Sequence, residues 1–272
     1  MNTIQIDTIK RQFPSSWNEL SRQQLLEVSR KFLARITAAD FKMGLLKAFL
    51  QLKKSYLRSI DAEDVFFLGE TLNFLLDANK LTINLIRRIY IKRWAGIRMY
   101  CGPDDSMKSC TFGEFIKADQ KKDAYSTSKN ERDMDALVAI LYRPRKPLWF
   151  IRRHFTENTD PRRRFIDRTL DKRTDMMKYV PPEIKFAVIL FFNGVLESLP
   201  EKFPHVFRKK ADQDEDTLGW AGLVISLADG KTDDESLNKI MDSNMYNVFL
   251  GLEHKALEYY KFKKKYKISD DE

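Results

Sequence analysis

The sequence predicts a mainly α-helical protein, an irregular helical bundle with one small β-hairpin around residues 87–100. Three observations lead to this prediction. Apolar residues recur at helical spacing over most of the chain, while one short stretch is instead rich in β-branched and aromatic residues. A hydrophobic fraction of 43%, with 19 phenylalanines, is also enough to form a buried core in a chain of 272 residues.

The first predicted helices lie in the N-terminal part of the chain. Ser21 is placed to cap the first helix, with Gln24 three positions later as its capping-box partner. Apolar spacing predicts a second helix over residues 39–57 and a third over residues 61–78. The acidic first turn of the third helix suits the positive end of a helix dipole.

The hydrophobic period changes in the middle of the chain. Segments 87–92 and 97–100 are short and rich in β-branched and aromatic residues, which predicts the two strands of the hairpin. Thr111 is then placed to cap a short helix, with Glu114 as its capping-box partner. The polar stretch 121–130 predicts a loop.

The next segments alternate between apolar and basic. Residues 134–142 predict an apolar helix that Pro144 ends, and residues 143–178 predict an irregular, basic segment. The pair Pro181-Pro182 predicts the start of another apolar helix, which ends near Pro200.

The acid-rich stretch 209–216 is the candidate domain boundary. It divides a helical main domain with the hairpin, residues 1–210, from a C-terminal helical segment, residues 211–272. Helices are predicted in this segment over residues 218–228 and from 236 to about 262. The C-terminal segment either packs on the same core or forms a unit of its own.

Residues able to catalyse a reaction are scarce. His154, His205 and His254 lie some fifty residues apart, and Cys101 and Cys110 do not form a Cys-x-x-Cys pair, so no metal site is predicted. No glycine-rich phosphate loop and no Gly-x-Ser-x-Gly elbow is present, so no cofactor is predicted. We therefore expect a non-enzymatic protein. An enzyme stays open only if a histidine and a carboxylate converge in a deep pocket of the fold.

Composition also predicts where the protein works. The longest apolar run, residues 186–192, is far shorter than the roughly 20 residues that span a bilayer. The N-terminus lacks the basic start and apolar run of a signal peptide. We expect a cytoplasmic protein with free thiols and no membrane contact. The net charge of +9 favours acidic partners.

Two stretches carry most of this positive charge. Residues 143–178 hold 12 basic and 5 acidic residues, and residues 80–98 hold six basic residues and no acidic one. Arginines interleaved with aromatic residues are typical of surfaces that bind single-stranded nucleic acid, but arginine stems also pack over aromatic rings at the edge of a fold or on a protein-binding face. Candidate partner or nucleic-acid contacts are Arg143, Arg145, Lys146, Trp149, Arg152, Arg153, Arg162, Arg163 and Arg164.

Five sequence segments also resemble, in the same order, late-gene proteins from prophages and tailed phages of Bacteroides-type bacteria. The segments are Pro14–Leu20, with Pro-Ser-Ser-Trp-Asn-Glu-Leu; Tyr100–Asp105 followed by Thr111–Asp119; Ala139–Pro144; Pro181-Pro182 ahead of Leu190–Gly194; and Gly219-Trp220 ahead of Leu227-Ala228.

This resemblance implies a protein of the tail-morphogenesis region, acting as a tail-assembly chaperone for tape-measure or tail-tube proteins. Such a chaperone shields long amphipathic helices until tail subunits polymerise, using helix-in-groove contacts. It implies no functional residue, and Trp17, Phe112, Tyr142 and Trp220 are interpreted as structural anchors. The alternative, from another class, is a nucleic-acid-binding accessory protein that uses residues 143–178. The partner's identity and the oligomeric state are open.

Overall fold

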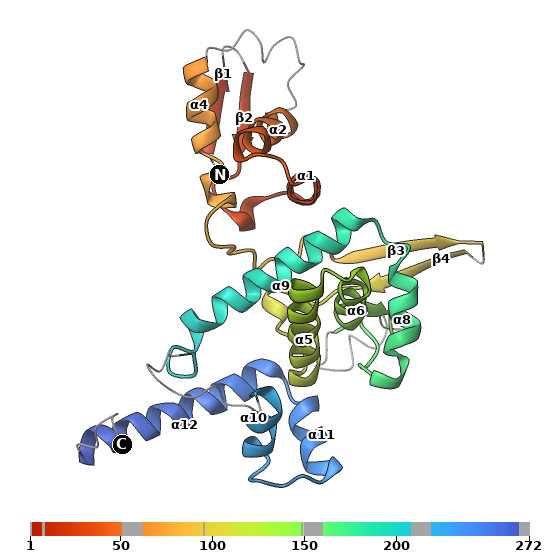
Figure 1. The fold of residues 1–272 in the computed structure, drawn as a ribbon, viewed down its shortest axis with the longest axis vertical. Coiled ribbons are helices and arrows are strands. Elements are labelled where there is room, and N and C mark those ends of the chain that lie inside the picture. Colours follow the sequence, from red (N-terminus) through yellow and green to blue (C-terminus); the bar gives the residue numbers. More distant parts are fainter. Residues whose placement is uncertain are drawn as a thin grey trace.

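A computed structural model describes residues 2–6, 9–50, 62–94, 96–147, 149, 160–207 and 219–266. Its helices lie in three groups along the long axis of the molecule, and one long helix, α9, runs from the first group toward the third (Figure 1). The predicted mainly α class with a small β-hairpin is confirmed.

The first group contains the N-terminal hairpin and three helices. Its elements are β1 (Asn2–Ile6), β2 (Ile9–Phe13), α1 (Arg22–Leu33), α2 (Ala38–Leu50) and α4 (Ala62–Glu70). The predicted capping box is confirmed: the hydroxyl of Ser21 accepts from the backbone N–H of Gln24, whose side chain accepts from the backbone N–H of Ser21.

The middle group surrounds a three-stranded antiparallel sheet with strand order β3-β4-β5. Its elements are β3 (Arg88–Arg93), β4 (Gly96–Cys101), α5 (Phe112–Ser128), α6 (Glu131–Leu141), β5 (Arg143–Pro144), α8 (Leu170–Met177) and α9 (Pro182–Lys202). The β3–β4 hairpin confirms the prediction for residues 87–100, and Gly96, with φ of +110°, provides the turn conformation that a side chain would disfavour. Figure 1 shows the hairpin extending past α8.

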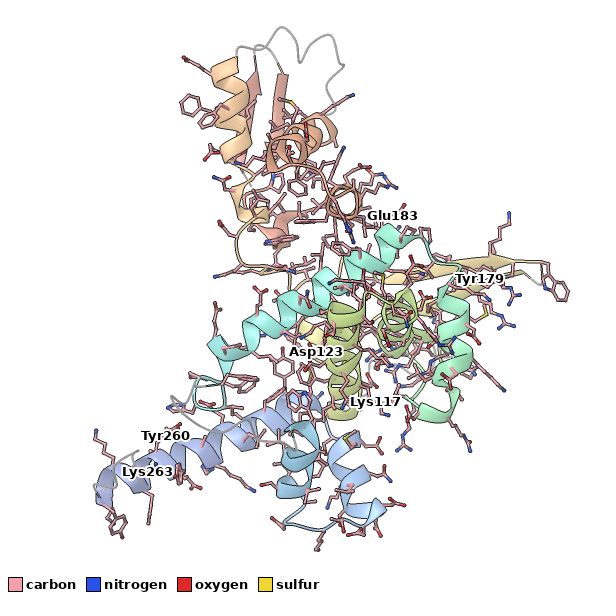
Figure 2. The ribbon with its side chains drawn as sticks, viewed as in Figure 1. Lys117, Asp123, Tyr179, Glu183, Tyr260 and Lys263 are labelled. Carbon is pink, nitrogen blue, oxygen red and sulfur yellow. The ribbon has the colours of Figure 1, made fainter. Side chains whose placement is uncertain are left out.

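Long-range ion pairs attach the N-terminal part of α9 to its neighbours. Near its N-terminus, Glu183 points toward α1 (Figure 2) and pairs with Arg30 at 3.1 Å. Lys185 pairs with Asp135 of α6, and both side chains are buried. These contacts fix the long helix against both the first and the middle group.

The third group consists of α10 (Gly219–Leu227), α11 (Asp234–Asp242) and α12 (Met245–Tyr266). Aromatic rings pack this group against α5: the ring centroids of Phe115 lie 5.4 Å from those of Trp220 and of Phe249. The indole N–H of Trp220 also donates to the Asp119 carboxylate at 3.0 Å. The buried residues of α10 and α12 therefore belong to the same apolar cluster as those of α5 and α9. The division at 209–216 falls outside the described residues and stays a prediction.

Two segments contain more helix than the sequence predicts. Residues 121–130 were expected to form a loop, but α5 continues to Ser128, because Lys122 pairs with Asp119 at 2.9 Å and Lys121 with Asp133 at 2.9 Å. The segment 143–178 was expected to be irregular, but it contains α8, which packs against α6.

Two other predictions placed helices too long. The helix expected over 61–78 ends at Glu70, where the Thr71 hydroxyl donates to the carbonyl of Leu68. The helix expected from 236 to about 262 is divided between α11 and α12, because the Ser243 carbonyl accepts from the N–H of Phe112 and fixes the break against the start of α5. Residues 51–57 of the second predicted helix lie outside the described residues.

Gly194 marks a close approach between two segments. It lies in α9, and a Cβ atom at this position would meet the backbone of Leu81, with 2.6 Å to its nitrogen. Backbone atoms cannot move aside as the end of a side chain can. Any larger residue here therefore has to displace either α9 or the segment around Leu81.

We predict that Gly194→Ala lowers the free energy of unfolding by about 2–3 kcal/mol, because of this overlap. Gly251→Ala is the matched control, since Gly251 lies in α12 with nothing within 4 Å of the added Cβ, and it should stabilise the protein by about 0.5–1 kcal/mol. Urea denaturation measures both values. Equal effects of the two substitutions would contradict the close approach at Gly194.

Candidate functional site

A buried cluster of four charged side chains lies at the centre of the middle group. We call Glu114, Arg143, Asp160 and Arg162 the ion cluster. The Glu114 carboxylate lies 2.7 Å from Nη1 of Arg143 and 3.4 Å from Nη2 of Arg162, and the side chains of these three residues are at most 2% exposed. Asp160 closes the cluster, 2.9 Å from Nε of Arg162 and 3.7 Å from Nη2 of Arg143.

Arg162 also connects three segments of the chain. Its guanidinium donates to the carbonyl of Leu141 at 3.0 Å, which satisfies a free carbonyl at the C-terminus of α6. It further lies 3.3 Å from the hydroxyl of Ser109 and 3.6 Å from the sulfur of Cys110. The loop before α5, the end of α6 and the segment at Asp160 are therefore held by one side chain.

The charges of the ion cluster cancel. Two arginines face two carboxylates, and only Asp160 has some contact with solvent, so each charge depends on its opposite for stabilisation. Burial, followed by the neighbouring positive charge of Arg162, lowers the pKa of Arg143. Burial also raises the pKa of the Cys110 thiol to about 12, so this sulfur is protonated and unreactive at neutral pH.

Glu114 has a different role from the one its spacing predicts. The Thr111 hydroxyl accepts from the backbone N–H of Glu114 at 3.3 Å, which confirms the cap. The carboxylate of Glu114, however, does not return to the backbone of Thr111 as in a capping box; it is turned inward to the two arginines. Two long-range charge pairs in a buried site outweigh one local hydrogen bond.

Two of the nine predicted partner contacts are therefore not on the surface. Arg143 and Arg162 are buried in the ion cluster, where their guanidinium groups are held by carboxylates and carbonyls and do not reach a partner. The sequence does not distinguish these two buried arginines from the exposed arginines near them.

The other predicted contacts lie near the surface or outside the described residues. Arg145 lies over the ring of Trp149, 4.9 Å from its centroid, and Lys146 donates to the backbone carbonyl of Asp160 at 3.0 Å. Arg163 and Arg164 are exposed, and the latter pairs with Asp242. Arg152 and Arg153 lie outside the described residues. Their roles as contacts stay predictions.

A small pocket of about 260 Å³ lies directly over the ion cluster. We call it the arginine pocket; it is lined by Arg87, Arg88, Cys101, Gly102, Pro103, Asp104, Ser109, Arg145, Trp149, Asp160 and Pro161. Its two carboxylates are already occupied, since Asp104 accepts from the backbone N–H and hydroxyl of Ser109 and Asp160 belongs to the ion cluster. Three arginines and two carboxylates line the pocket, so its charge is positive overall.

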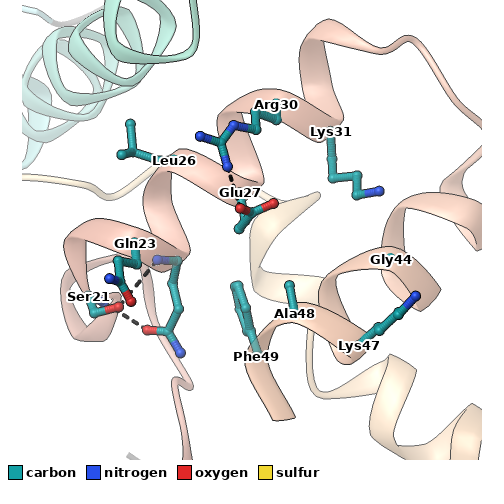
Figure 3. Close-up of a pocket in the computed structure, with 11 residues that line it drawn as sticks. Ser21, Gln23, Leu26, Glu27, Arg30, Lys31, Gly44, Lys47, Ala48 and Phe49 are labelled. Carbon is teal, nitrogen blue, oxygen red and sulfur yellow. Dashed lines mark hydrogen bonds and ion pairs between the residues drawn. The ribbon is translucent and has the colours of Figure 1, made fainter. Parts of the chain in front are cut away.

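Another pocket, of about 790 Å³, lies between α1 and α2 (Figure 3). Its arginine, Arg30, is neutralised by Glu27 and Glu183, and its Gln24 forms the capping box. Lys31 lies across Gly44, where a Cβ would meet its side chain at 2.7 Å. The residues that line this pocket include no histidine, cysteine or aspartate, so it offers no acid–base pair with histidine and no thiol nucleophile.

A groove of about 580 Å³ between α2 and α4 differs from the other pockets, because apolar side chains form most of its surface. We call it the helical groove; it is lined by Ala38, Ala39, Lys42, Met43, Leu46, Phe66, Gly69 and Glu70. Met43 is 45% exposed and Phe66 is 66% exposed. Its two charged residues pair with each other, Lys42 Nζ to Glu70 at 2.9 Å. The sequence predicts no function for these residues, because their apolar spacing is that of ordinary helix packing.

Two histidine–carboxylate pairs occur among the described residues. His254 and Glu258, 3.6 Å apart, are both exposed on α12. The Glu253 carboxylate contacts the ring of His205 and accepts from the backbone N–H groups of His205 and Val206, at 3.1 and 3.0 Å. It attaches α12 to the turn after α9, and it lines none of the pockets described above.

In the part of the chain that the structure describes, no group of three or more metal-ligating side chains converges. No described helix has both the length and the apolar character needed to cross a bilayer.

Comparison of the chain with known proteins gives no significant match among family models, curated proteins or solved structures.

We predict that Glu114→Gln lowers the free energy of unfolding by about 3–5 kcal/mol, because it leaves two buried arginines with one carboxylate. Asp175→Asn is the control: Asp175 pairs with Arg132 at 3.3 Å at the surface, and its loss should cost less than about 1 kcal/mol. Chemical denaturation of both variants measures the difference. Similar small costs for both would show that the ion cluster does not stabilise the fold.

We also predict that Cys101 and Cys110 resist alkylation in the folded protein. Both thiols are buried and burial raises the pKa of each, so little thiolate is present at pH 8. Iodoacetamide labelling followed by mass spectrometry should show slow modification in buffer and rapid modification in denaturant. Rapid labelling of Cys110 in buffer would contradict its buried position.

Proposed function

We propose that this chain is a non-enzymatic assembly protein of a phage or prophage tail region, a tail-assembly chaperone that binds an amphipathic helix of a tail component in the helical groove. The observation that carries the proposal is the groove itself, in which Met43 and Phe66 are exposed between two helices. The resemblance of five ordered segments to late-gene proteins supplies the class of partner.

The groove has the properties that helix-in-groove binding requires. Its floor is apolar, with Leu46 buried at the base, and the small side chains of Ala38, Ala39 and Gly69 leave room for a second helix to approach. Methionine adapts its shape to different apolar partners, which suits a surface that holds repeated amphipathic segments.

The neutral charge of the helical groove also favours the apolar face of a helix as its ligand. Because Lys42 and Glu70 neutralise each other, the groove offers no unpaired charge to a polar segment. Placing a polar face there would remove its water without a compensating hydrogen bond. An apolar helix face, such as a tape-measure protein presents before the tail polymerises, loses no hydrogen bonds on binding.

The absence of a catalytic role is part of the proposal. Among the described residues, the cysteines are buried thiols with raised pKa values. Of the two histidines paired with carboxylates, His205 supports a turn and His254 is exposed on α12. The four charges of the ion cluster sum to zero, and the cluster lies inside the fold. These arrangements support binding to a macromolecule rather than activation of a small substrate.

Coexpression with the tape-measure and tail-tube proteins encoded beside this gene tests the proposal. We predict that the full chain copurifies with one of them, and that the double variant Met43→Glu, Phe66→Glu loses at least about 90% of this capture, because burying two carboxylates in an apolar groove is unfavourable.

Leu250→Glu with Tyr259→Glu is the matched control, since both residues are exposed on α12, away from the groove. This variant should retain the partner. Failure of the unmodified chain to bind any tail protein would refute the chaperone proposal, and equal loss in both double variants would refute the groove as its site.

A further inference from the structure

We propose that the outer face of the β3–β4 hairpin, together with the arginine pocket at its base, binds single-stranded nucleic acid. This inference concerns a surface separate from the helical groove and does not depend on the chaperone proposal. The nucleic-acid hypothesis from the sequence placed the contacts in residues 143–178, and the structure shifts the most suitable surface to the hairpin.

Strand pairing places cationic and aromatic side chains on one face of the hairpin. Arg88, Tyr90 and Lys92 alternate with buried Ile89 and Ile91 along β3, so all three point outward. The register pairs Tyr90 with Met99 and Lys92 with Ile97, which adds their side chains to the same face.

The tip of the hairpin adds a second aromatic group. Trp94 is 93% exposed and Tyr90 is 56% exposed, although large aromatic side chains normally bury most of their surface. An exposed ring beside a cation is the arrangement on which nucleobases stack while their phosphates are neutralised.

The base of this face continues into the arginine pocket, because Arg88 lines both. Arg87 is neutralised by two contacts to Asp105 at 2.8 and 2.9 Å, and the carboxylates of the pocket are engaged elsewhere. Within the described part of the chain, no carboxylate lies within ion-pair distance of Arg88 or Arg145. These two guanidinium groups are therefore available to a phosphate.

The opposite face of the hairpin is covered at Ile89 and Ile91, which favours a single strand over a duplex. Ile89 and Ile91 are buried, and Arg93 packs against the end of α8, 5.0 Å from the ring centroid of Tyr179 (Figure 2). A ribbon inserted into a duplex groove needs access on both faces. A single strand lies along one face, and Arg88 and Lys92, about 13 Å apart along β3, match a path over several nucleotides.

An acidic membrane surface is the competing partner for exposed tryptophan and lysine. The residues near Trp94 argue against a membrane partner. Arg93 is held against Tyr179, and the exposed aromatic side chains lie along the strand instead of together at the tip. Stacking along a strand fits bases better than it fits a lipid interface.

Fluorescence anisotropy with labelled oligothymidylate and oligouridylate of about 20 nucleotides tests the proposal with the full chain. We expect binding that weakens steeply between about 50 and 200 mM salt. Arg88→Gln with Lys92→Gln should weaken binding at least about tenfold at the lower salt concentration and reduce the salt slope by about 1.4, since two phosphate contacts are lost. Trp94→Ala should weaken binding about tenfold through loss of stacking.

The matched control is Lys239→Gln with Lys255→Gln, which removes the same charge from exposed positions on α11 and α12 and should bind as the unmodified chain does. Equal weakening in this control would show non-specific attraction and refute the site. The proposal is also refuted by absence of binding at low salt, by tighter binding of duplex than of single strands, or by binding of phosphatidylserine-containing vesicles without binding of either oligonucleotide.

Discussion

The carboxylate of Glu114 determines how the middle of this protein is assembled. It lies at the start of α5, and it holds two arginines that come from β5 and from the segment after Asp160. Neither arginine has access to solvent, so neither segment can leave without exposing the remaining charges to an apolar interior. Since Arg162 also binds the last carbonyl of α6, the ion cluster connects helix ends as well as side chains.

This constraint separates the arginines that hold the fold from the surfaces that we propose for binding. The arginines of the ion cluster are buried, whereas the helical groove of the first group and the hairpin face beside the middle group lie at the periphery. These two surfaces have opposite chemistry, one apolar and neutral, the other cationic and aromatic.

Local sequence signals predicted the elements whose causes are local. Ser21 with Gln24 predicted a capping box that the structure contains, and the β-branched run predicted the hairpin. Thr111 with Glu114 has the same spacing, yet only the cap formed, because partners distant in sequence attract the carboxylate. The break between α11 and α12 likewise depends on a contact with the start of α5, so the pattern within the segment did not reveal it.

The same distinction applies to the candidate sites. Arg143 and Arg145 are indistinguishable by composition, yet Arg143 is buried in the ion cluster and Arg145 lies over Trp149. Met43 and Phe66 have the spacing of core residues, and their exposure depends on how α2 and α4 meet. Charge and aromatic content predicted that a basic surface exists, whereas its position required the fold.

Glu114 and Arg143 stabilise each other inside the protein. A double-mutant cycle with Glu114→Gln, Arg143→Met and the combined variant, measured by urea denaturation, tests this coupling. We expect a coupling free energy on the order of 2 kcal/mol, with the double variant more stable than the sum of the single losses implies. A coupling below about 0.5 kcal/mol would contradict it, because the two charges would then act independently.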